Sequence, residues 1–70
     1  MKVKYGVQNP NDDSSAFVTF TSAREATAYA RTVSADTGEP VRVWAEQLDG
    51  LNRGNVWRYA DVHPSGHVAR

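Results

Sequence analysis

The stretch TSAREATAYARTVSADTGEP, residues 21–40, decides the fold. Ser22 followed by Glu25 forms a capping box, in which the serine side chain accepts a hydrogen bond from the amide of the third helical residue. Gly38 stands where a left-handed residue ends a helix, and Pro40 prevents the helix from continuing. The stretch therefore predicts a single helix between Ser22 and Gly38.

This helix has one face suited to burial. Small and apolar side chains recur at the i, i+3, i+4, i+7 and i+11 positions of that face: Ala26, Tyr29, Ala30, Val33 and Thr37. The remaining residues are mostly polar and lie largely off the stripe: Arg24, Thr27, Arg31, Ser34 and Asp36. The small alanines allow the helix backbone to approach a sheet closely.

Extended segments flank the helix on both sides. Apolar and polar residues alternate in four segments, which we expect to be strands: 2–8, 16–20, 41–48 and 56–62. Turn-forming residues join the strands of each pair. His63-Pro64 ends the last strand, and we expect the residues after Gly66 to be frayed. The sequence predicts one α+β domain over residues 1–70, a two-layer β-β-α-β-β fold with an ordered core at about 2–62 and a tail at 63–70.

Composition excludes several classes of protein. Eight basic residues balance eight acidic ones, and there is no cysteine among the 70 residues. These counts exclude a polybasic nucleic-acid binder, a disulfide-stapled toxin, a thiolate zinc site and a disordered tail of high net charge. No run approaches the ~20 apolar residues of a membrane helix, and the first residues lack the apolar core of a signal peptide. We therefore expect no membrane partner, and cytoplasmic location is the default expectation.

A single helix covers only one face of a four-stranded sheet, so the other face is the candidate for function. Trp44, flanked by charged residues of opposite sign, is expected on that face, either as a contact for a partner or as a simple cover for the sheet. Trp57 and Tyr59 either join the core or lie beside Trp44, and we expect at least one of them to be buried. The candidate partner-binding residues are Trp44, Arg42, Glu46, Lys4, Trp57 and Tyr59.

Single-stranded nucleic acid is the alternative partner. Such ligands bind where aromatic side chains lie in a positive groove. The aromatic residues named above could form such a platform with four basic residues: Lys2, Lys4, Arg42 and Arg58. The zero net charge argues against it, as do the acidic residues Asp12, Asp13, Asp49 and Asp61.

Catalytic and metal-binding patterns are weak. His63 and His67 are four residues apart, but Pro64 and Gly66 prevent the helix that would bring them onto one metal. The oxygen-rich segment 9–15 lacks the glycine and glutamate of a calcium loop.

A catalytic set of Ser14, His63 and Asp61 can be written, but nothing in the sequence fixes its geometry. It would require a ligand-sized pocket lined by His63 or Asp61. We therefore expect no enzymatic activity, no cofactor, no metal and no small-molecule substrate.

Several motifs together resemble a known family. The helix sequence TSAREATAYAR (21–31), then Gly38, Val41-Arg42-Val43, Asp49-Gly50 and Tyr59 look like the small β-β-α-β-β domains of the DUF2188 type, which are common in small bacterial and phage open reading frames. The resemblance covers about residues 17–62. The long loop 9–15 and the longer last loop depart from it. It implies the fold alone, because that family has no settled activity.

These observations favour a non-enzymatic protein-interaction module that docks on another protein through an exposed sheet face or edge. An accessory or inhibitor protein of a phage or mobile element, docking on a host protein, would be one form of it. A homodimer that uses the same face or an edge strand would be another.

Overall fold

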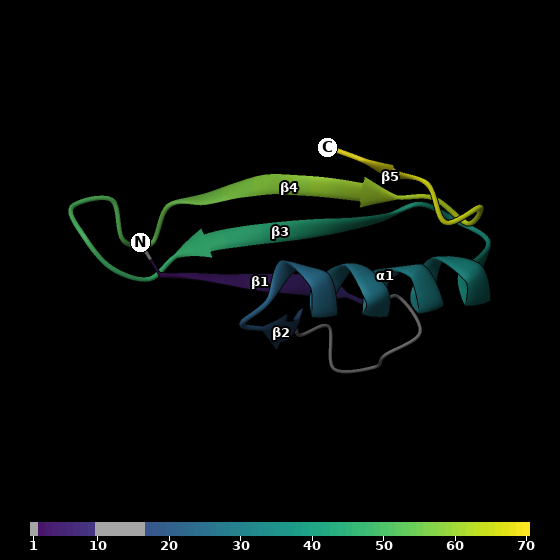
Figure 1. Ribbon diagram of the computed structural model, residues 1–70, viewed down its shortest axis with the longest axis horizontal. Coiled ribbons are helices and arrows are strands. Elements are labelled where there is room, and N and C mark those ends of the chain that lie inside the picture. The colour runs from purple at the N-terminus through teal and green to yellow at the C-terminus, as the bar shows by residue number, and fades with distance from the viewer. Residues whose placement is uncertain (1, 10–16) are drawn as a thin grey trace.

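The computed structural model describes residues 2–9 and 17–70. One helix lies against a five-stranded antiparallel sheet, and the elements follow the order β-β-α-β-β with a short final strand (Figure 1). The α+β fold predicted from the sequence is confirmed. The elements are β1 (Val3–Gln8), β2 (Phe17–Phe20), α1 (Ala23–Thr37), β3 (Val41–Gln47), β4 (Val56–Val62) and β5 (Val68–Ala69).

Helix α1 begins and ends as its local sequence predicts. The side chain of Ser22 accepts a hydrogen bond from the amide of Glu25. Gly38 adopts a left-handed conformation with φ 73°, and its N–H donates to the carbonyl of Ser34 at 2.9 Å. Both ends of the helix are therefore satisfied by residues next to it in the chain.

The sheet has the strand order β2-β1-β3-β4-β5, with every neighbouring pair antiparallel. The predicted hairpin of β1 and β2 is present, and Val7 lies opposite Val18 in it. Strands β1 and β3 meet at the centre, where Val7 lies opposite Val43. The central position of β1 and β3 places their side chains at the middle of both faces of the sheet.

The residues after β4 form a strand instead of the frayed end expected from the sequence. A tight turn reverses the chain: the His63 amide donates to the His67 carbonyl at 2.9 Å, and the Gly66 amide donates to the His63 carbonyl at 2.8 Å. Pro64 lies in this turn, and the φ of Gly66 is 90°. The proline thus reverses the chain and starts a further hairpin, so that β5 pairs with the end of β4.

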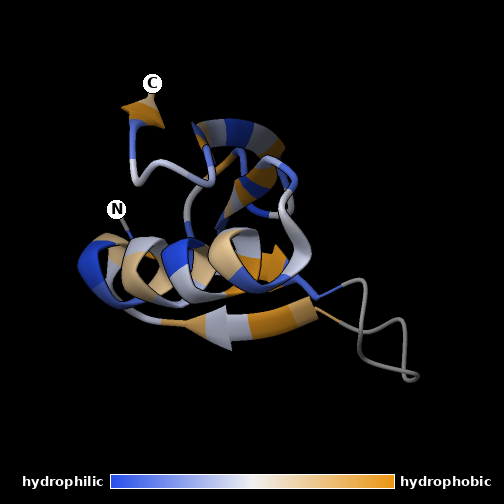
Figure 2. Cartoon of the chain, turned by 90° about the vertical axis from the view of Figure 1, so that its right-hand side faces the viewer, coloured by the Kyte–Doolittle hydropathy of each residue, from blue (hydrophilic) through white to orange (hydrophobic). Residues whose placement is uncertain are grey.

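The core consists of small aliphatic side chains enclosed by half-buried aromatic ones. The buried apolar residues are Val7, Ala26, Ala30, Val33, Val41, Val43, Ala45, Ala60 and Val62. Two aromatic contacts border them: the rings of Tyr5 and Tyr59 lie 5.2 Å apart, and those of Phe20 and Tyr29 lie 5.5 Å apart. In Figure 2 the helix is mixed in hydropathy, as an amphipathic helix should be, and the β2 strand beside it is more strongly hydrophobic.

Ser34 was expected off the buried stripe of the helix, and that expectation is wrong. Its side chain is fully buried, and its hydroxyl donates to the carbonyl of Glu39 at 2.6 Å. The contact closes the turn that follows α1 and supplies the partner that a buried hydroxyl requires.

A bulge in β4 decides which side chains share a face of the sheet. Val43 lies opposite Ala60 and Trp44 lies opposite Arg58, so Tyr59 is an extra residue on β4. An extra residue in one strand shifts the alternation of its side chains. The single alternation predicted over Val56–Val62 is therefore broken at Tyr59.

Trp57 and Tyr59 both lie on the helix side of the sheet. Trp57 is opposite buried Ala45, and Tyr59 packs against the core beside Tyr5. Arg58 is opposite Trp44, on the other face.

Within the part of the chain that the structure describes, no helix has the length and apolar character needed to cross a membrane.

Candidate interaction surface

The face of the sheet turned away from α1, called here the open face, carries most of the predicted site. Its residues follow from the strand registers: Lys4, Gly6, Gln8, Phe17, Thr19, Arg42, Trp44, Glu46, Val56, Arg58 and Asp61. Four of the six predicted residues are brought together there: Lys4, Arg42, Trp44 and Glu46. Trp57 and Tyr59 are not, because the bulge turns them to the helix side.

A hollow of about 310 Å³ lies near the middle of the open face. Gly6, which has no side chain, lines it, and Phe17 lies close by: a Cβ atom at Gly6 would lie 3.4 Å from the Cβ of Phe17. Trp44 and Val56 are also in its lining, and Lys4 and Glu46 complete it on the polar side. This Gly6 hollow is a mainly apolar depression on a solvent-exposed sheet.

Two residues that line the Gly6 hollow, Phe17 and Val56, are not among the site residues predicted from the sequence. Phe17 and Val56 leave 48% and 53% of their surface exposed, which is high for residues of their size. Alternation along 17–20 does separate Phe17 from Phe20, but the register with β1 decides which of them faces outward. The seven-residue loop between the strands (residues 9–15) left that register open.

Ion pairs surround the apolar centre of the open face. Lys4 Nζ lies 3.5 Å from Glu46 Oε1. Arg42 Nε lies 2.9 Å from one carboxylate oxygen of Asp61, and Arg58 Nη1 lies 3.6 Å from the other. These pairs join three cations of the open face to two carboxylates, Glu46 and Asp61, although exposed pairs add little to stability.

The guanidinium of Arg42 also contacts the predicted aromatic. Its central carbon lies 5.4 Å from the centroid of the Trp44 ring, within the range of a cation–π contact. Arg42 is thus held both by Asp61 and by the indole, which orders the centre of the open face before any partner arrives.

Within residues 2–9 and 17–70, Asp61 is the one group whose pKa departs clearly from its ordinary value. The hydrogen bond from Arg42 lowers the pKa most, and the positive charges of Arg42, Arg58 and His63 lower it further. Partial burial acts in the opposite direction and is outweighed. The carboxylate is therefore charged throughout the neutral range.

This shift predicts a pH dependence of stability. A carboxyl group with a lowered pKa in the folded state stabilises the fold above its unfolded pKa, near 3.8, and the contribution is lost as the pH falls through the folded pKa. We expect Asp61→Asn to lower the free energy of unfolding by about 1 kcal/mol at pH 7, and by less at acid pH. Urea denaturation of both proteins across this range measures the difference. A constant difference between them at all pH values would contradict the prediction.

The platform predicted for nucleic acid is only partly assembled. Of its three aromatics, Trp44 lies on the open face, whereas Trp57 and Tyr59 lie on the other. Its cations Lys4, Arg42 and Arg58 are held in ion pairs.

The two histidines and Asp61 lie at one end of β4 and in the turn that follows it. The rings of His63 and His67 are 5.8 Å apart, and no group of three or more metal-ligating side chains occurs within 2–9 and 17–70. Asp61 and His63 do line a surface depression of about 480 Å³ together with Arg42 and Trp44. Ser14, the third member of the predicted catalytic set, falls outside the described residues, as does most of the oxygen-rich segment 9–15.

No protein-family model, curated protein or solved structure matches this chain. The resemblance to DUF2188-type domains stays a prediction, and function has to be argued from the surface itself.

Proposed function

We propose that the protein acts by docking on another protein through its open face, with the Gly6 hollow at the centre of the contact. The observation that carries the proposal is an apolar depression, lined by Gly6, Phe17, Trp44 and Val56, beside side chains already joined in ion pairs. Hot spots of protein interfaces have this arrangement, an aromatic anchor and a pocket within a ring that excludes water.

The size of the hollow supports a protein partner. About 310 Å³ is enough for one large apolar side chain. Phe17 and Val56 expose apolar surface that a partner would cover. A single protruding leucine or aromatic residue on a partner would fit the hollow, and that partner's surrounding surface would cover the open face.

The ion pairs favour protein over nucleic acid. A phosphate backbone binds by replacing counterions of free cations, and Lys4, Arg42 and Arg58 are already paired with carboxylates. A partner protein does not have to break these pairs, because it can cover them as a polar rim.

The experiment is capture of a partner by the purified protein, followed by measurement of its affinity for variants. Trp44→Ala removes the anchor, and Gly6→Val fills the hollow. The control is Leu51→Ala, which removes a fully exposed apolar side chain in the β3–β4 loop. We expect Trp44→Ala and Gly6→Val each to weaken the complex at least about tenfold, with no change for Leu51→Ala.

Three outcomes would contradict the proposal. A partner that binds Trp44→Ala and Gly6→Val as tightly as the unaltered protein does not use the open face. Sedimentation equilibrium that shows a dimer lost in Trp44→Ala would identify a second copy as the occupant. A salt-sensitive shift of an oligothymidine that disappears in Trp44→Ala would identify nucleic acid instead.

A further inference from the structure

The outer edge of β4 is mostly without a neighbouring strand. Strand β5 pairs only with Asp61 and Val62 at the end of β4. Within the described residues, Val56, Trp57, Arg58 and Ala60 have a ladder partner on the β3 side alone, and the bulge residue Tyr59 has none. An exposed strand edge of this kind accepts an extended segment of another chain. These five positions are called the β4 edge.

The backbone groups at the β4 edge can be assigned from the hairpin. The Gln47 amide donates to the Asn55 carbonyl at 2.9 Å, so Asn55 is turned toward β3. Because backbone groups alternate in direction along an antiparallel strand, those of Val56 and Arg58 are turned outward. The β4 edge therefore offers backbone donors and acceptors to a further strand.

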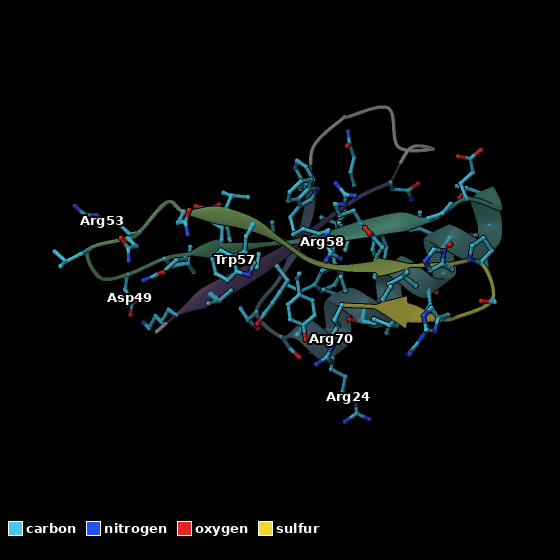
Figure 3. The ribbon with its side chains drawn as sticks, turned by 90° about the horizontal axis from the view of Figure 1, so that it is seen from above. Arg24, Asp49, Arg53, Trp57, Arg58 and Arg70 are labelled. Carbon is cyan, nitrogen blue, oxygen red and sulfur yellow. The ribbon has the colours of Figure 1, made fainter. Side chains whose placement is uncertain are left out.

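A positively charged cleft lies beside the β4 edge, on the helix side. Its volume is about 480 Å³, and its lining includes Arg24 and Arg31 of α1, Tyr59 of β4, and Val68 and Arg70. Figure 3 shows Arg24 and Arg70 extending to the same side of β4. The guanidinium carbon of Arg70 lies 5.3 Å from the Tyr59 ring centroid, and Arg31 Nε donates to the Gly66 carbonyl at 3.4 Å.

The charge of this cleft is not balanced. Within residues 2–9 and 17–70, no ion pair joins Arg24, Arg31 or Arg70 to a carboxylate. The cations of the open face, by contrast, are paired. Three arginines of one cleft in a chain of zero net charge form a local site for carboxylates.

We propose that the β4 edge binds an extended acidic peptide segment as an additional strand, whose carboxylates pair with Arg24, Arg31 and Arg70. The backbone of the segment would bond to the β4 edge, and its acidic side chains at alternate positions would enter the cleft. A second copy of this chain fits less well, because antiparallel pairing centred on Arg58 would place like charges opposite each other. The site uses the backbone of Val56 and Arg58 and not their side chains on the open face.

The pairing of carboxylates with the three arginines is tested with a labelled peptide of alternating Glu and Val. Its binding is measured by fluorescence anisotropy at low salt. We expect Arg24→Glu to weaken binding about tenfold, because repulsion replaces an attraction. Arg53→Glu is the matched control: it makes the same change of charge at an exposed position in the β3–β4 loop. We expect Arg53→Glu to change the affinity for the peptide by no more than about twofold, because the substituted charge acts only through long-range electrostatics.

Val56→Pro tests strand addition. Proline removes the outward N–H at the first residue of β4, where it is tolerated, while Val56→Thr keeps that N–H. We expect about tenfold weaker binding with proline and no change with threonine. Circular dichroism checks that each variant is folded.

Several results would overturn the proposal: no measurable binding, equal binding of a Lys-Val peptide, unaltered binding by Val56→Pro, or equal losses from Arg24→Glu and Arg53→Glu. Tighter binding of an oligothymidine, lost in Arg24→Glu, would assign the cleft to nucleic acid. Trp44→Ala should leave peptide binding unchanged. Failure of the open-face proposal and failure of this one are therefore distinguishable.

Discussion

Val43→Ala is expected to lower the free energy of unfolding by about 2–3 kcal/mol. Val43 is fully buried in β3, opposite Val7 on one side and Ala60 on the other. Two methyl groups are lost from the centre of the core, and the neighbouring alanines cannot extend to fill the space. A domain of this size has a total stability of about 3–5 kcal/mol, so the variant should be partly unfolded under mild conditions.

The matched control is Val56→Ala. It deletes the same atoms from the adjacent strand, at a position that is 53% exposed, and should cost less than about 0.5 kcal/mol. Urea denaturation of the three proteins gives both differences. Equal losses from Val43 and Val56 would mean that the core is not where the structure places it.

Tyr59→Ala is expected to cost about 2–3 kcal/mol. The bulge turns Tyr59 toward the core, where its ring packs edge-on against Tyr5 at 5.2 Å. Its removal exposes the apolar side chains beneath the ring. It also deletes the contact with the Arg70 guanidinium.

The informative comparison is with Trp44→Ala, which removes a larger aromatic side chain. Trp44 lies on the open face, so we expect its loss to cost less than about 1 kcal/mol. Thermal unfolding followed by circular dichroism measures both variants. If Trp44→Ala proves the more destabilising of the two, the assignment of faces along β4 is wrong.

The helix could be predicted from the sequence because its determinants are local. Ser22 and Gly38 act within one turn of the residues they cap, and no distant partner is needed to place them. The limits of β4 were likewise marked by the turn residues on both sides of it. The burial of Ser34 was not predicted, because it depends on the carbonyl of Glu39 after the chain has turned.

The candidate site could be predicted only in part, for the same reason. Alternation along β1 and β3 correctly placed Lys4, Arg42, Trp44 and Glu46 on one face, since no irregularity shifts β1 against β3. The faces of Trp57 and Tyr59 depend on how β4 pairs with β3. The sequence of β4 alone does not specify that pairing. Strand β5 was not predicted, because a strand of two residues is too short to show an alternation of apolar and polar side chains.

The bulge at Tyr59 changes which residues of β4 face the helix. After it, the even-numbered Ala60 and Val62 do so, and before it the odd-numbered Trp57 does. Deletion of that one residue would restore continuous alternation with Val62 and Ala60 still buried. Trp57 would stay on the helix side opposite Ala45, and Val56 and Arg58 would stay on the open face. The inserted residue therefore adds one aromatic side chain to the helix side without moving its neighbours, so deletion of Tyr59 would remove its contacts with Tyr5 and Arg70 and leave the composition of the open face unchanged.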